Sequence, residues 1–188
     1  MKIFKEVILT IIAFSLYISS AQAACDFIIN IGDKKTKLVE KIAEPIPMFP
    51  GQFMLPVQST ELCPHDNLDK DIAVEYIFLE DDLAAIRLAA IRMLVLNDGK
   101  NTLSNKLTLM NYAKKVYGDF DTGQNPGIYN NFNVWEKSQS IVIYKRLLDA
   151  EDMIVEEIYI SNKKYDEKLG KFYYDLEMNE LKEEENTN

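Results

Sequence analysis

The alternation of apolar and polar residues is clearest in the middle and in the last third of the chain. Residues 73–86, "AVEYIFLEDDLAAI", combine β-favouring side chains with an acidic turn at 81–82, and this pattern predicts a β-hairpin. Similar runs predict three further strands, at 132–135, 141–147 and 153–162. Neighbouring runs separated by short polar turns are typical of an antiparallel sheet.

A direct repeat makes the next element ambiguous. The sequence "LAAIR" occurs twice in tandem, as Leu83–Arg87 and Leu88–Arg92. Five extra residues in a strand turn every later side chain to the other face unless a bulge restores the phase. In a helix they rotate the face by roughly 140°, and Ala, Leu, Arg and Met favour helices. Two alternatives therefore stand for residues 83–94, a bulged strand or a short helix.

Two amphipathic helices are predicted. Residues 104–117 place apolar side chains on one face, with Ser104 as the N-cap and Gly118 as the residue that ends the helix. Residues 166–181, "DEKLGKFYYDLEMNEL", form the second helix. We expect the acidic residues 182–188 to form a disordered tail.

Residues 45–64 contain five of the six prolines and many apolar residues. Because proline has no N–H to donate to a sheet, we expect an extended strap here and not a central strand. The strap either packs across the core or presents an exposed surface to a partner, formed by Met48, Phe49, Phe53 and Met54.

These elements predict an α+β fold. We expect an antiparallel sheet of about five or six strands, packed against two helices on one face and preceded by the proline-rich extended strap. Residues 26–44 add an apolar strand at 27–31 and then a strand or a short helix through 38–42. The length of the chain indicates a single domain over residues 24–181.

The N-terminus has the pattern of a signal peptide. Lys2 and Lys5 precede twelve uncharged residues, 7–18, a run that is shorter than the roughly 20 residues of a spanning helix. Small residues then occupy positions −3 and −1 of a cleavage site after Ala23. We expect residues 1–23 to be removed and the protein to be periplasmic or secreted in a bacterium, with no transmembrane segment after cleavage.

Two cysteines fit such an oxidising compartment. An even number of cysteines in an exported chain indicates a disulfide, here Cys25–Cys63, which would staple the N-terminal segment 24–66. A lipid on Cys25 is the less favoured alternative. Gln22 stands where bacterial lipoprotein signals usually carry leucine.

Net charge argues against nucleic acid as a partner. The formal net charge is −9, and loss of residues 1–23 makes it −10, because two lysines and one glutamate are removed with them. A chain this acidic is repelled by phosphates and by anionic headgroups.

The residues for metal or nucleophilic chemistry are few. His65 is the sole histidine, which excludes His-rich zinc sites and HExxH chemistry. We predict no cofactor and no metal centre beyond a weak calcium pattern at Asp119, Asp121 and Asn125. The oxygen donors alternate as in a calcium loop, but Asn130 stands where an EF-hand carries glutamate.

Seven aromatic residues lie between residues 112 and 144. Such density indicates either a core or a surface for a partner, with Tyr129, Phe132 and Trp135 as candidates. We therefore expect a non-enzymatic binding or accessory protein for a partner protein or envelope component. The alternative is a periplasmic hydrolase that uses a carboxylate pair, although no spacing singles out such a pair.

Overall fold

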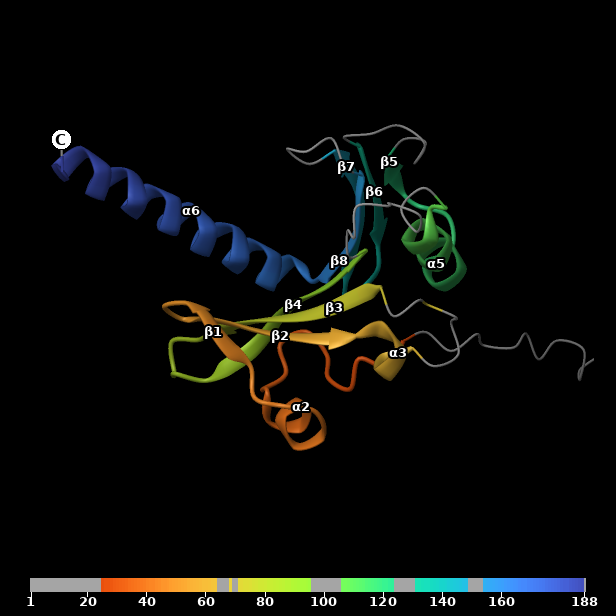
Figure 1. Cartoon of the computed structure of the whole chain (residues 1–188), viewed down its shortest axis with the longest axis horizontal. Helices are drawn as coiled ribbons and strands as arrows, with labels where there is room; N and C mark the ends of the chain where they lie inside the picture. The colour runs from red at the N-terminus through yellow and green to blue at the C-terminus, as the bar shows by residue number, and fades with distance from the viewer. Residues whose placement is uncertain are drawn as a thin grey trace, which may run out of the picture.

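An antiparallel sheet organises the chain. The structure is a computed structural model that describes residues 25–63, 68, 71–95, 106–123, 131–148 and 154–187. Within these ranges the sheet has eight strands (Figure 1). The strands are β1 (Ile46–Phe49), β2 (Gln52–Gln58), β3 (Ile72–Glu80), β4 (Ile86–Val95), β5 (Thr122–Gly123), β6 (Asn131–Glu136), β7 (Ile141–Leu148) and β8 (Ile154–Ser161).

Two four-stranded meanders meet in the middle of the sheet. The spatial order is β1-β2-β3-β4-β8-β7-β6-β5, and every neighbouring pair is antiparallel. The α+β class and the antiparallel sheet are confirmed, but the expected count of five or six strands is too low. The expected strand at 27–31 does not form, whereas β1, β2 and β5 are additional strands.

The proline-rich strap is part of the sheet, so the expectation of a separate strap was wrong. Its residues form the β1–β2 hairpin around Pro50 and Gly51, and β2 pairs with β3 along its whole length. Pro56 is tolerated because β1 reaches only as far as Met54 along β2. Beyond that point β2 is an edge strand on that side, and an edge is where proline is accepted in a sheet.

The tandem repeat forms a bulged strand, and the helix alternative was wrong. Ile77 pairs with Ala90 and Phe78 pairs with Leu88, so Ala89 is the extra residue of a β-bulge. The bulge restores the phase that the repeat disturbs. The last two residues of each copy therefore lie on matching faces: Ile86 and Ile91 contact the main core, and Arg87 and Arg92 lie on the opposite face.

The helices cover both faces of the sheet, contrary to the expectation of two helices on one face. The segment 25–42, with α2 (Thr36–Lys41), α3 (Ser59–Leu62) and α5 (Thr108–Tyr117), covers the main core. On the other face, α6 (Lys163–Thr187) packs on a smaller cluster (Figure 1). The small residues of the bulge allow this helix to approach the sheet closely. This cluster contains Ile77, Leu79, Ala89, Ala90, Tyr165 and Leu169.

The two long helices differ in their termini from the expected ones. Helix α5 ends before Gly118, whose φ of +83° favours glycine, as predicted. Its expected N-cap, Ser104, lies outside the described residues, and the helix begins at Thr108. Helix α6 begins earlier than expected, where Asn162 Oδ1 accepts a hydrogen bond from Tyr165 N at 3.0 Å. The helix continues to Thr187, through the residues that we expected to form a disordered tail.

A disulfide joins Cys25 to Cys63 across 38 positions, as predicted from the cysteine count. Both cysteines are buried in the main core. The bond attaches the first described residue to the end of α3, beside the sheet. Within the described ranges, no helix combines the length and the apolar character that crossing a bilayer requires.

Opening this bond should destabilise the fold. For C25S/C63S we expect the free energy of unfolding to fall by about 4 kcal/mol. Without the disulfide, the unfolded chain gains the conformational entropy that closing a loop of this length removes. Urea unfolding of the variant and of the wild type, each with and without reductant, measures the effect. Reductant should lower the wild-type midpoint and leave that of the variant unchanged. Equal midpoints for wild type and variant without reductant would contradict the expectation.

Candidate functional site

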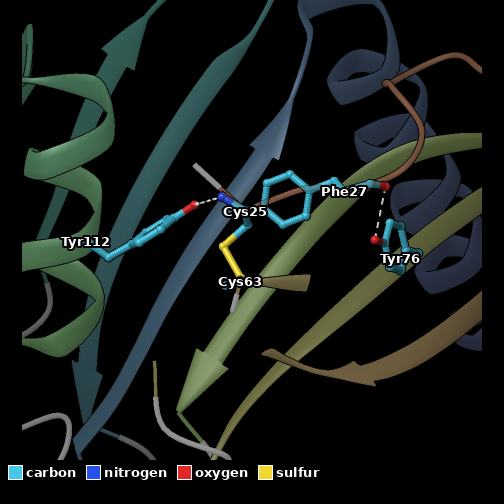
Figure 2. The surroundings of a disulfide bond; sticks show 5 residues. All are labelled: Cys25, Phe27, Cys63, Tyr76 and Tyr112. Atoms are coloured by element: carbon cyan, nitrogen blue, oxygen red, sulfur yellow. Dashed lines mark hydrogen bonds between the residues drawn. A yellow bond between two sulfur atoms is a disulfide. The ribbon is translucent and has the colours of Figure 1, made fainter. Parts of the chain in front are cut away.

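The segment that follows Cys25 is held from two sides (Figure 2). On one side, Cys25 N donates a hydrogen bond to the hydroxyl of Tyr112 from α5, at 3.2 Å. On the other, the hydroxyl of Tyr76 from β3 donates to Phe27 O at 3.0 Å. Burial, and secondly the charge of Asp26, raise the pKa of Tyr76, so its hydroxyl stays a donor. The backbone of residues 25–27 is thus held in place by two tyrosines, and we refer to the segment 25–31 as the wall.

A groove lies beside this wall. It has a volume of about 1010 Å³ and is bounded by the segment 25–31, the turn between β6 and β7, and the start of α6. Its floor comes from β4 and β8, near the middle of the sheet, through Ile91 and Ile160, and Ile141 at the start of β7 lines the groove as well. Clefts of this size, where separate covering layers meet over a sheet, are typical binding sites.

The groove is lined by isoleucines, by uncharged polar residues and by three lysines. Three isoleucines of the wall, Ile28, Ile29 and Ile31, join those of the floor. The rim has Lys137 from the β6–β7 turn and two lysines from the first turn of α6. Lys137 Nζ donates a hydrogen bond to Tyr117 O at 3.0 Å, and Lys164 Nζ lies over the ring of Tyr165. In a chain whose net charge is −9, three lysines that line one groove are a local excess of positive charge. The rim lysines are Lys137, Lys163 and Lys164, and Asp26 also lines the groove.

The wall contains a backbone conformation that isoleucine rarely adopts. Ile28 has φ of +65°, and for a β-branched residue this left-handed conformation is strained. It is held locally, because Ile28 N donates to Asp26 Oδ1 at 2.9 Å and Ile29 N donates to Phe27 O at 2.6 Å. Strain of this kind is characteristic of sites whose shape matters for function.

The comparisons with known proteins identify no relative: no family model, curated protein or solved structure matches the chain.

The residues that we predicted as a partner surface lie in two separate places. Met48 and Phe49 are exposed on β1, at one edge of the sheet, and Phe53 and Met54 are half-buried on β2, the paired strand of the same hairpin. Phe132 lies on β6, and four strands, β3, β4, β8 and β7, separate β6 from β2. Tyr129 lies outside the described residues.

The aromatic residues around Trp135 form core and not an open surface. Trp135 is fully buried, and its Nε1 donates a hydrogen bond to Gly118 O at 2.8 Å. The rings of Tyr117 and Phe120 pack against it, with centroids 6.3 and 6.1 Å away. The indole therefore anchors the end of α5 to β6, and it is not available to a partner in this structure.

The weak calcium pattern is only partly described. Asp121 Oδ2 accepts a hydrogen bond from Glu136 N at 2.7 Å, so this carboxylate joins the loop to β6. Asp119 is exposed, and Asn125 lies outside the described residues. Among the residues whose positions are known, no group of three or more His, Cys, Asp or Glu side chains is arranged to hold a metal ion.

A buried glutamate that the sequence reasoning missed caps α5. Glu156 on β8 is fully buried, and its Oε1 accepts hydrogen bonds from Met110 N at 3.1 Å and from the Tyr144 hydroxyl at 2.9 Å. The first bond satisfies an amide in the first turn of the helix. The alternation of β8 could have found it, because Glu156 has the same parity as the buried Ile158 and Ile160.

Burial raises the pKa of Glu156 to about 7, although the two hydrogen bonds and the nearby Arg146 oppose the shift. The folded chain therefore binds this proton more tightly than the unfolded chain does. Its contribution to stability is complete below the unfolded pKa, and it is lost as the pH rises through about 7.

The free energy of unfolding should consequently contain a component from Glu156 that falls by about 3 kcal/mol between about pH 5 and about pH 8. Urea unfolding at several pH values measures this component. It is the difference between wild type and E156Q, whose side chain cannot ionise, in how steeply the free energy of unfolding falls with pH. E177Q, which changes an exposed glutamate of α6, is the control and should keep the wild-type slope. Identical slopes for wild type and E156Q would contradict the assignment.

Proposed function

We propose that the protein is an exported, non-enzymatic binding protein whose groove beside the disulfide holds an anionic amphiphile, such as a fatty acid. The observation that carries the proposal is the combination of an isoleucine-lined groove of about 1010 Å³ with a rim of three lysines. The apolar chain would lie on the isoleucines, and the anionic group would meet the lysines.

Shape and charge support this class of ligand. The volume is at the upper end of the range of about 300–1,000 Å³ for small-molecule sites, which suits a long chain better than a compact molecule. Six isoleucines offer dispersion contacts to an alkyl chain, and polar residues such as Asn30, Ser138 and Gln139 line the same groove. The lysines supply the charge that selects an anion at one end.

Export is the second part of the proposal. It is supported by the signal-like residues 1–23 and by the disulfide between Cys25 and Cys63. A periplasmic or secreted protein meets free fatty acids and lysolipids released from the envelope. Mass spectrometry of the mature chain should find Ala24 as its first residue, and a lipid on Cys25 would contradict the disulfide.

Ligand binding tests the groove directly. Isothermal titration with dodecanoate, dodecyl phosphate and the neutral dodecyl maltoside separates the role of the charge from that of the chain. We expect both anions to bind and the neutral amphiphile to bind at least about tenfold more weakly, a difference of about 1.4 kcal/mol. Equal affinity for all three would contradict the role of the lysines, and no binding of any would contradict the site.

Variants localise the ligand. K163A/K164A should weaken dodecanoate binding by about tenfold, because two solvent-facing ion pairs contribute about that much. I141D should weaken binding, because it puts a charge next to the apolar residues that line the groove. The control is K171A, whose lysine pairs with Asp175 on α6 and does not line the groove. Binding that is unchanged in both groove variants would place the ligand elsewhere.

A carboxylate-dependent hydrolase is the second candidate, and Glu156 is the observation that favours it. A carboxyl whose pKa is raised to about 7 and that is hydrogen-bonded to Tyr144 has the character of a general acid. Hydrolysis of ester or glycoside substrates by wild type but not by a stably folded E156Q would favour this function. The burial of Glu156 under α5 is the reason that binding ranks first.

A further inference from the structure

Most of the polar residues that line the groove come from the place where β7 begins and β8 ends. Ile141 and Ser161 are the terminal residue pair between these two strands, so the turn 137–140 and the residues 162–164 leave the sheet at the same end. Both segments line the groove. We refer to them as the polar end of the groove, and its residues are Lys137, Ser138, Gln139, Ser140, Asn162, Lys163 and Lys164.

The polar end offers several hydrogen-bond donors to a ligand. The turn is closed by its backbone, because Lys137 N donates to Ser140 O at 2.9 Å and Ser140 N donates to Lys137 O at 3.4 Å. These bonds do not use the hydroxyls of Ser138 and Ser140. Asn162 Oδ1 accepts a hydrogen bond from Tyr165 N, which leaves the side-chain Nδ2 as a donor. A ligand group with several acceptor oxygens would match this set of donors.

The charges that line the groove sum to +2. Among the described residues that line it, three lysines and one aspartate are charged, so the sum is three minus one. The contacts of Lys137 with a carbonyl oxygen and of Lys164 with a ring leave both charges without a counter-ion. The aspartate is Asp26 on the wall, whose Oδ1 accepts a hydrogen bond from Ile28 N. A ligand of charge −2 would therefore balance the groove, whereas a carboxylate would leave one positive charge unbalanced.

We propose that the ligand of this groove is a long-chain phosphate monoester, whose phosphate lies at the polar end and whose alkyl chain lies on the isoleucines. This inference rests on the proposed function and names the headgroup of its ligand. A phosphate monoester has three acceptor oxygens and a charge between about −1.5 and −2 at pH 7. A carboxylate has two oxygens and a single charge. The monoester thus matches both the donors and the charge of the groove better than a fatty acid does.

Four ligands separate the contributions of charge, headgroup and chain. Isothermal titration of the full mature chain at pH 8 compares dodecyl phosphate with methyl dodecyl phosphate, dodecanoate and inorganic phosphate. Methyl dodecyl phosphate is a diester of similar shape whose charge stays at −1, and inorganic phosphate has no chain. We expect dodecyl phosphate to bind at least about tenfold more tightly than each of the others, a difference of about 1.4 kcal/mol.

Protonation of the headgroup gives a second test with the same ligands. Between pH 8 and pH 5 the monoester takes up its second proton, whose pKa is about 6, and its charge falls to −1. Its affinity should then approach that of the diester, whose charge does not change. Because both ligands meet the same protein, their ratio cancels any effect of the protein's own titrating groups, such as Glu156.

Variants test whether the phosphate lies at the polar end. S138A/S140A and K163Q should each reduce the preference for the monoester over the diester from about tenfold to less than about threefold, because hydrogen bonds and charge that favour the monoester are lost. The control is K168Q, which changes a lysine of the same helix that lies over the ring of Tyr165 and does not line the groove. It should keep the wild-type preference. Circular dichroism verifies that the variants are folded.

The outcomes distinguish this inference from the proposed function. Equal affinity for monoester and diester at pH 8, a preference that persists at pH 5, or a preference that is unchanged in both polar-end variants would each overturn the phosphate headgroup. Inorganic phosphate that binds as tightly as dodecyl phosphate would overturn the role of the chain. If dodecanoate and the diester bind as well as the monoester, only the headgroup is wrong. Failure of all three amphiphiles to bind would contradict the proposed function itself.

Discussion

Four residue pairs between β4 and β8 join the two halves of the molecule. Ile91 to Leu94 face Glu157 to Ile160, and each half is otherwise a meander of neighbouring strands. The N-terminal segment attaches to one half through the disulfide at Cys63 and to the other through the Tyr112 hydroxyl. The segment therefore crosses the junction between the two halves. The pairing of β4 with β8, the two attachments of the segment and the groove beside it depend on one another.

The tyrosine contacts and the Glu156 contact in the interior differ in how they respond to pH. Tyr76 and Tyr112 hold the backbone of the segment through their hydroxyls, and burial raises the pKa of Tyr76, so its hydroxyl remains a donor near neutral pH. Glu156 joins α5 to the sheet with a group that changes charge in that range. The contact that Tyr76 makes with the segment is thus unchanged near neutral pH, whereas the contact between Glu156 and α5, the helix that carries Tyr112, is not.

Local patterns predicted most of the elements and few of the relations between them. The hairpin at 73–86, the strands β6 to β8 and the end of α5 at Gly118 follow from alternation and turn residues. Proline misled the assignment of β2, because its position relative to the end of β1 is a property of the sheet. The sequence could not predict the groove for the same reason. Ile28, Lys137 and Lys163 are far apart in the sequence, and they become neighbours only when β4 pairs with β8.

The bulge at Ala89 gives the tandem repeat a use beyond correct phase. One edge of β4 serves two partners, because Lys35 N bonds to Ile86 O while Ile91 pairs with Ile160 of β8. Ile86 and Ile91 are the same position in the two copies of "LAAIR". Because β4 runs from Ile86 to Val95, it is long enough for the N-terminal segment and the second meander to occupy the same edge one after the other, with neither displacing the other.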